Sequence, residues 1–99
     1  MVEWHELANE VGAILKEKGQ AVAVAESSAG GLISAALLAV PGASTYFLGG
    51  AVVYTGAARQ GLLGIGDEAM AGMRASTEPY AMLKARSVRA ALGTTWGLS

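Results

Sequence analysis

The sequence predicts a layered α/β/α domain with a mainly parallel sheet. Segments of helical periodicity alternate with short apolar runs along the chain, which is the pattern of an α/β fold. The run at residues 21–25 contains only Ala and Val, and this composition is typical of a strand covered on both faces. With 99 residues there is enough chain for one core, so we expect a single domain spanning residues 1–99.

The first half of the chain predicts a helix, a strand and a second helix. Apolar residues recur at spacings of three, four and seven between Val2 and Lys18, and Gly19 ends this helix. The strand at residues 21–25 follows. Leu, Ile and Ala at helical spacing over residues 30–40 predict the next helix, which Pro41-Gly42 stops.

The middle of the chain predicts a second strand and two short helices. Val52, Val53 and Tyr54 favour a strand over residues 51–55, and the glycine pair before it predicts a bend or bulge. Residues 57–63 are typical of a short helix. Asp67 can cap another helical piece that extends to residue 73.

The last quarter of the chain predicts a helix and a third strand. Ser76, Thr77 and Pro79 form a helix start with a hydroxyl cap and a proline in the first turn, and Gly93 ends the helix. Residues 94–99 begin a strand. The basic side chains in this helix are expected to form a solvated face rather than a nucleic-acid patch; they are Lys84, Arg86 and Arg89.

Composition excludes several classes of function. The absence of cysteine and the presence of a single histidine argue against a metal site, and no cofactor is expected. A net charge of −1 offers no electrostatic footprint for DNA or RNA. The longest uncharged stretch is broken by Gly, Ser and Pro-Gly, so no membrane span is expected, and the acidic N-terminus does not resemble a secretory signal. We therefore expect a cytoplasmic protein.

The hydrophobic content is high for a soluble domain. Apolar residues make up 53% of the chain and charged residues only 15%, against about a quarter in typical domains. Some apolar surface is therefore expected to be covered by a partner, and an exposed strand edge tends to pair. We expect a homo-oligomer, in which another chain completes the sheet.

The turn between the first predicted strand and its helix is the main candidate for chemistry. It reads Glu26-Ser27-Ser28-Ala29-Gly30-Gly31. Backbone N–H groups at such a helix start suit a phosphate, a carboxylate or an oxyanion, and the two serines add hydroxyls. An equally weighted alternative is that the serines cap the helix and the glycines allow close packing.

Ordered motifs along the chain resemble the CinA C-terminal domain family. They are AESSAGG at residues 25–31, VPGAST at 40–45, YTGAAR at 54–59 and LLGI at 62–65. The later stretch STEPYAMLKARSVRAALGTTWGLS also resembles the family's following helix and strand. The family continues into a TG-x-AGP loop, so the resemblance implies the N-terminal part of the family domain, a fold truncated relative to the family.

This resemblance implies the activity of nicotinamide-nucleotide amidase, a family member that deamidates nicotinamide mononucleotide to nicotinate mononucleotide and ammonia. It implies Ser27 as the nucleophile, with Arg59 at the position of the family's lysine base and Tyr54 as possible support. The substrate-binding residues that it implies are Glu26, Ser28, Ala29, Gly30, Gly31 and Ser44.

Two positions differ from the family pattern. A guanidinium stays protonated, so Arg59 cannot act as a base, although its donors suit a phosphate or carboxylate. Ala29 replaces a threonine. Neighbouring strand residues point to opposite faces, so Glu26 is not expected to serve as a base for Ser27. Whether the domain is an amidase acting on a linear amide or a non-catalytic nucleotide-binding, anion-binding or oligomerisation domain of the same fold stays open.

Overall fold

The computed structural model describes residues 2–99, and side chains from residue 4 onward. Helices and strands alternate through the chain, with a 3₁₀ turn before the second strand. The elements are α1 (Val2–Lys18), β1 (Val22–Glu26), α2 (Leu32–Leu38), η1 (Ala43–Thr45), β2 (Phe47–Val52), α3 (Gly56–Leu63), α4 (Glu78–Leu92) and β3 (Trp96–Leu98).

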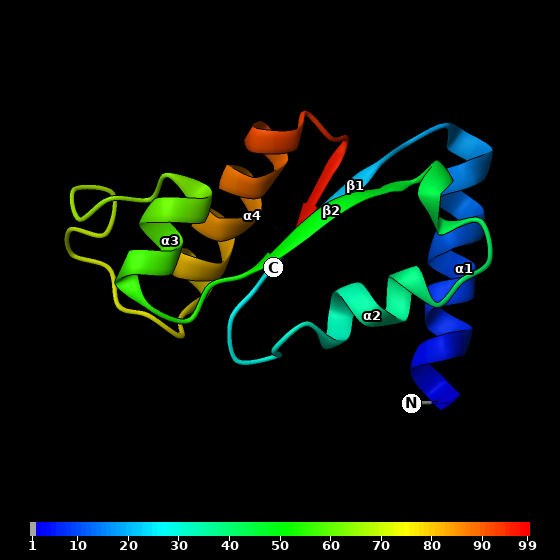
Figure 1. Ribbon diagram of the computed structural model, residues 1–99, viewed down its shortest axis with the longest axis horizontal. Coiled ribbons are helices and arrows are strands. Elements are labelled where there is room, and N and C mark those ends of the chain that lie inside the picture. The colour runs from blue at the N-terminus through cyan, green and yellow to red at the C-terminus, as the bar shows by residue number, and fades with distance from the viewer. Residues whose placement is uncertain (1) are drawn as a thin grey trace.

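The three strands form one parallel sheet in the order β2-β1-β3 (Figure 1). Each residue of β1 is buried, as expected for a central strand with neighbours on both sides and helices on both faces. The parallel sheet and the buried first strand are therefore confirmed. Because parallel strands point the same way, the turns that leave β1 and β2 lie at one edge of the sheet.

Alternating side chains of β1 divide the core into two layers. Val22 and Val24 pack with α1, α2 and Tyr46, whereas Ala23 and Ala25 pack with Val88 of α4. Figure 1 shows α1 and α2 on one side of the sheet and α4 on the other. The layered α/β/α arrangement predicted from the sequence is confirmed.

The longest helices begin and end as their sequences predict. Helix α1 has the expected bounds, and Gly19 beyond it has a φ of +63°. Thr77 caps α4 by accepting a hydrogen bond from the Tyr80 N–H, and the left-handed Gly93 ends the helix. Proline in the first turn costs α4 no hydrogen bond, because that N–H has no intrahelical partner.

Two expectations for the middle of the chain are wrong. The second strand is Phe47–Val52 instead of residues 51–55, because Gly49 and Gly50 pair with Ala23 and Val24 inside the ladder. The register shifts between Phe47 and Gly49, so the irregularity lies at Leu48, before the glycine pair at which a bend or bulge was expected. Residues 67–73 form turns rather than a helix, although Met70 and Ala71 donate single-turn hydrogen bonds.

Within residues 2–99, the helices are all too short or too polar to span a bilayer.

Candidate functional site

Ser27 follows the last residue of β1 and begins the turn to α2. The Gly30 N–H donates to the Ser27 carbonyl at 3.0 Å, and the Leu32 N–H donates to the Ala29 carbonyl at 3.2 Å. Gly30 and Gly31 have φ values of +66° and +103°, in the left-handed region where side chains are disfavoured. The glycine pair thus allows the chain to reverse sharply between the strand and the helix.

The carboxylate of Glu26, the last residue of β1, lies at the N-terminal end of α2. Its Oε1 accepts from the Gly31 N–H at 3.2 Å and from the Ile33 N–H at 2.9 Å. Its Oε2 accepts from the Ser34 N–H at 2.9 Å and from the Ser34 hydroxyl at 2.7 Å. The expectation of free N–H groups at this helix start is therefore corrected: the Glu26 carboxylate accepts from Gly31, Ile33 and Ser34. The Gly30 N–H is likewise used by the Ser27 carbonyl.

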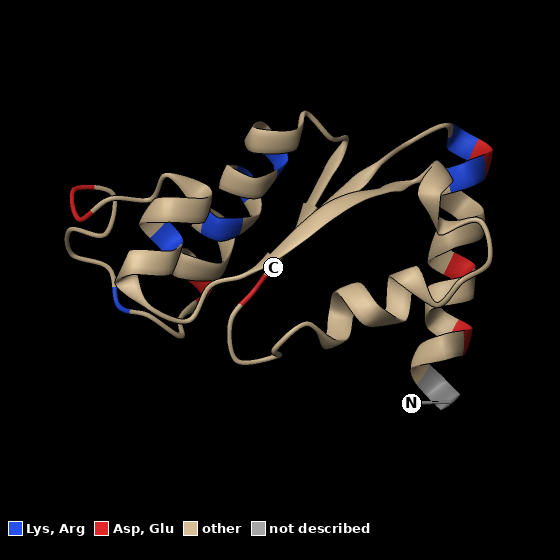
Figure 2. Ribbon diagram, in the orientation of Figure 1, with Lys and Arg blue, Asp and Glu red and all other residues tan. Residues whose placement is uncertain are grey.

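The buried Glu26 is stabilised as an anion. Burial acts to raise its pKa, but the hydrogen bonds from Ser34, Ile33 and Gly31 outweigh that effect and hold the pKa below its ordinary value. Glu26 is also the one charged residue in α2 and the three strands (Figure 2). We interpret it as the structural cap of α2, with no free lone pair directed at Ser27.

A cavity of about 480 Å³ opens beside Ser27 at the carboxyl end of the sheet. Parallel α/β sheets bind their ligands at this edge. The volume lies within the range of small-molecule sites. Its lining comes from the β1–α2 turn, the start of α4 and the end of β3; the residues are Glu26, Ser27, Ser28, Ala29, Ile33, Ser76, Thr77, Glu78, Tyr80, Ala81, Lys84 and Ser99.

Lys84 contributes the basic group of this cavity. The side chain is only 6% exposed, so the expectation that it belongs to a solvated face is wrong. It lies on the buried stripe of α4 with Tyr80 and Val88, at spacings of four residues. Burial lowers the pKa of the Lys84 ammonium, and no neighbouring carboxylate offsets this effect.

Several polar groups at the cavity are available to a ligand. Ser27 is half-buried, and among residues 2–99 no hydrogen bond engages its hydroxyl or the backbone N–H groups of Ser28 and Ala29. The Ser99 hydroxyl is buried at the same cavity without a partner in the described chain. The site therefore combines a free serine, free backbone donors and a buried amine.

Other residues expected at the site lie outside the cavity lining. Arg59 is half-buried on α3, with its guanidinium packed over Gly56, and Tyr54 is 81% exposed. Ser44 belongs to η1, which precedes β2, whereas Ser27 follows β1. Since the strands are parallel, Ser44 lies at the opposite edge of the sheet. The fold thus brings together Glu26, Ser27, Ser28 and Ala29, but does not add these three residues to their cavity.

The helical spacing of α4 indicates that Lys84 is buried, although its charge alone predicts exposure. Tyr80, Lys84 and Val88 follow one another at intervals of four, so an apolar residue on either side of Lys84 places it on the core-facing stripe. In the described part of the chain, no cluster of three or more acidic or histidine side chains could hold a metal.

The fold and this edge define a class of protein: a parallel α/β domain with a serine-bearing turn at the carboxyl end of its central strand. Its sequence agrees with a model of the CinA C-terminal domain over residues 4–99. The chain belongs to the CinA C-terminal domain family.

Curated proteins from cyanobacteria are similar to this chain in sequence. A CinA-like protein of Synechococcus elongatus is 41% identical over 93 residues, and one of Synechocystis is 42% identical over 93 residues. Each match covers 94% of this chain but 22% of the relative. The chain therefore spans less than a quarter of the length of these relatives.

Solved structures share the fold. A competence/damage-inducible protein of Agrobacterium tumefaciens matches with a TM-score of 0.84 and 31% identity, over 92% of this chain and 55% of that chain. A competence damage-inducible protein of Klebsiella pneumoniae matches with a TM-score of 0.84 and 28% identity, over 92% of this chain and 56% of that chain. This chain spans just over half the length of those proteins.

Proposed function

We propose that this chain is an amidase-like domain in which Ser27 is the nucleophile. The proposed reaction is the one that the family resemblance implies, hydrolysis of nicotinamide mononucleotide to nicotinate mononucleotide and ammonia. The observation that carries the proposal is the placement of the half-buried, unbonded Ser27 hydroxyl at a cavity of about 480 Å³.

The surroundings of Ser27 support acyl transfer. A serine hydroxyl becomes an effective nucleophile when a base removes its proton, and the developing oxyanion needs hydrogen-bond donors. Ser28 and Ala29 line the same cavity, and their backbone N–H groups, which make no hydrogen bond within residues 2–99, are the candidate donors. Since Glu26 takes the N–H groups at the start of α2, the substrate phosphate is proposed to bind elsewhere at the cavity.

The alternative function is a nucleotide-binding or anion-binding domain without turnover. The observation that favours it is Arg59, which remains protonated and lies outside the cavity. In that case mononucleotide would bind in calorimetry without release of ammonia. Tyr54 and Ser44 would have no part in a site built by one chain.

Ammonia release from nicotinamide mononucleotide tests the proposal. We expect turnover by the unaltered chain and its loss in Ser27→Ala. Ser28→Ala is the matched control, because it removes a neighbouring hydroxyl and keeps both backbone N–H groups. Equal rates in the unaltered chain and in Ser27→Ala would reject the amidase function.

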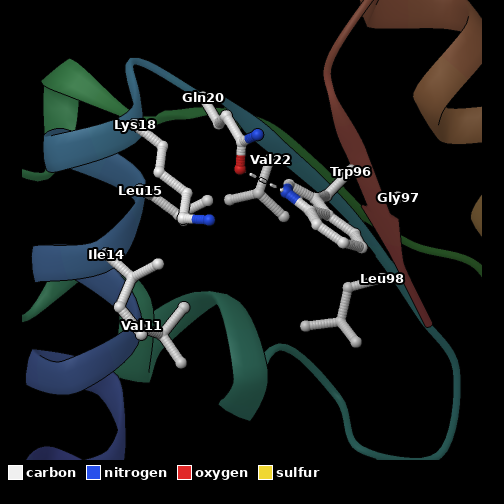
Figure 3. Close-up of a pocket in the computed structure, with 9 residues that line it drawn as sticks. All are labelled: Val11, Ile14, Leu15, Lys18, Gln20, Val22, Trp96, Gly97 and Leu98. Carbon is white, nitrogen blue, oxygen red and sulfur yellow. Dashed lines mark hydrogen bonds between the residues drawn. The ribbon is translucent and has the colours of Figure 1, made fainter.

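We also propose that residues 1–99 form a single domain, that the protein is cytoplasmic and that it forms a homo-oligomer. Support for self-association comes from an apolar cleft between α1 and β3, where Ile14, Trp96 and Leu98 are about half exposed (Figure 3). Apolar patches of this kind mark interaction sites. Edge strand β3 lies beside the cleft and can pair with another strand.

A further inference from the structure

Lys84 is a buried lysine without a charge partner among the residues that the structure describes. On the core-facing stripe of α4 it stands between Tyr80 and Val88, and its ammonium lies 4.6 Å from the centre of the Tyr80 ring. A core position of this kind usually holds an apolar residue, because burying an unpaired charge is costly. The ring face holds the amine in place, but it supplies no acceptor for its hydrogens.

The carboxylates at the same cavity do not neutralise Lys84. Both oxygens of Glu26 already accept hydrogen bonds from the start of α2. Glu78 is exposed at the first position of α4. Burial is accordingly the sole cause of the lowered pKa of Lys84, and a lowered pKa gives a larger share of neutral amine at physiological pH.

Lys84 and Ser27 reach one cavity from different elements. Ser27 lies at the carboxyl end of β1, and Lys84 comes from the face of α4 that covers the sheet beside β1. Of the basic side chains in the described chain, Lys84 alone lines this cavity. Arg59, which stands where the resemblance places a lysine, is packed over Gly56 on α3 and cannot release its proton.

We propose that Lys84 of α4 is the proton acceptor for Ser27. This inference rests on the proposed function and deepens it. The Lys84 amine takes the hydroxyl proton as the Ser27 oxygen bonds to the amide carbon, and the ammonium returns that proton to the departing nitrogen when the C–N bond breaks. Ammonia leaves and an acyl ester on Ser27 remains. The same amine then takes a proton from water, whose oxygen attacks the ester carbon. When the bond between that carbon and the Ser27 oxygen breaks, the ammonium returns the proton to the Ser27 oxygen, which releases the carboxylic acid and restores the hydroxyl and the neutral amine.

The first test compares turnover in Lys84→Met, Lys84→Arg and Arg86→Met. Methionine fills the buried position without a charge, and arginine keeps the charge without a usable base. We expect both Lys84 variants to lose about 10²- to 10⁴-fold in kcat. Arg86→Met, on the exposed face of the same helix, should keep the rate. Circular dichroism confirms that each variant is folded.

The pH profile separates proton transfer from a purely structural role. The titratable groups that face Lys84 at the cavity are Glu26 of β1 and Glu78 and Tyr80 of α4. In the unaltered chain and in Glu78→Gln, we expect kcat to rise with pH in one transition, whose midpoint lies below the ordinary lysine pKa. This transition should be absent from the pH profile of Lys84→Met.

A serine-directed fluorophosphonate tests the inference without the substrate. It phosphonylates an activated serine oxygen and releases fluoride, so its rate of reaction at Ser27 reports base assistance whatever the natural amide is. We expect labelling at Ser27 to fall at least about 100-fold in Lys84→Met. Labelling that depends on Lys84 without ammonia release would reject only the substrate. Equal labelling in both proteins, or none in either, would overturn the role of Lys84.

Discussion

Glu26 is a buried residue whose carboxylate accepts hydrogen bonds from the N-terminal end of α2. Its oxygens accept from the N–H groups of Gly31, Ile33 and Ser34 and from the Ser34 hydroxyl. A negative charge is favourable at a helix N-terminus, and charge-assisted hydrogen bonds are stronger than neutral ones. The residue next to Ser27 thus fixes the direction in which α2 leaves the strand.

Glu26→Gln is expected to destabilise the fold by about 1.5 to 3 kcal/mol, the range for hydrogen bonds to charged groups. The amide NH₂ of glutamine would face an N–H donor instead of accepting from it. Urea unfolding at neutral pH measures the difference. Glu78→Gln, an exposed change at the start of α4, is the control, and equal losses in both variants would contradict the capping role.

The same residue predicts acid sensitivity. The folded pKa of Glu26 is below its ordinary value of 4.5, so its contribution is present above the unfolded pKa and is lost as pH falls through the folded pKa. We expect the unaltered chain to lose stability below about pH 4.5 more steeply than Glu26→Gln. Parallel acid unfolding curves would contradict this expectation.

Lys84→Met is expected to stabilise the domain while it slows the reaction. Replacing a buried unpaired ammonium with an apolar chain removes the cost of burial, and a gain of about 1 kcal/mol raises Tm by roughly 4 to 8 °C in a domain of this size. The folded pKa of Lys84 is lowered, so the cost is greatest at low pH and disappears as pH rises towards the unfolded pKa. The gain should therefore shrink in alkaline buffer. Destabilisation at neutral pH would contradict an unpaired Lys84.

At the scale of the element, β3 and α4 approach each other closely. A Cβ atom at Gly97 would overlap the carbonyl oxygen of Ala85 and would lie 2.8 Å from the Arg89 Cβ. Glycine is therefore required where this edge strand crosses the helix. The contact matters for the proposed function, because α4 also supplies Lys84 to the cavity.

Gly97→Ala is expected to cost about 1 to 3 kcal/mol, the usual penalty for overpacking. Thermal unfolding measures this loss. Gly61→Ala is the matched control, because Gly61 lies within α3 with open space around it, and alanine there should stabilise by up to about 1 kcal/mol. If both variants melted alike, the close packing of β3 on α4 would be wrong.

Local patterns in the sequence predict most elements but miss two kinds of feature. Caps and hydrophobic periodicity predict α1, α4 and β3, because these signals lie within each segment. The start of β2 depends on pairing with β1, so the glycines inside it gave a misleading local signal. The charge of Lys84 predicts exposure to solvent, whereas its spacing from Tyr80 and Val88 indicates burial.

The sequence predicts only the part of the candidate site that lies within one segment. Ser27, Ser28 and Ala29 are adjacent in sequence, and the structure groups them at one cavity. The contribution of Lys84 depends on how α4 packs across the sheet, which no local motif encodes. The capping role of Glu26 depends likewise on the path of the turn that brings α2 back over the strand.

At the scale of the whole molecule, the described chain is compact, but many of its large apolar side chains are exposed. Its radius of gyration is 13.7 Å, close to the roughly 13 Å expected for a single domain of about 100 residues. Large apolar side chains remain exposed along α1 and β3, among them Leu7, Ile14 and Trp96. Figure 3 shows Ile14 and Trp96 facing a common cleft, on the face where we propose that a second copy binds.

Light scattering should therefore give a mass above that of the 10.0 kDa monomer. Ile14→Glu places a charge in the cleft and should shift the protein towards the monomer, because desolvating an unpaired carboxylate opposes association. Ala13→Glu adds the same charge at an exposed position of α1 outside the cleft lining and should leave the mass unchanged. A monomer at working concentrations would contradict self-association.

The central claim is that Ser27 reacts as a nucleophile in the cavity beside β1. The most direct measurement is the rate of ammonia release from nicotinamide mononucleotide by the unaltered chain, Ser27→Ala and Ser28→Ala. We expect Ser28→Ala to stay close to the unaltered rate and Ser27→Ala to fall to the uncatalysed background. Turnover that survives in Ser27→Ala would contradict the claim, whereas turnover that is absent from all three proteins would reject nicotinamide mononucleotide as the substrate.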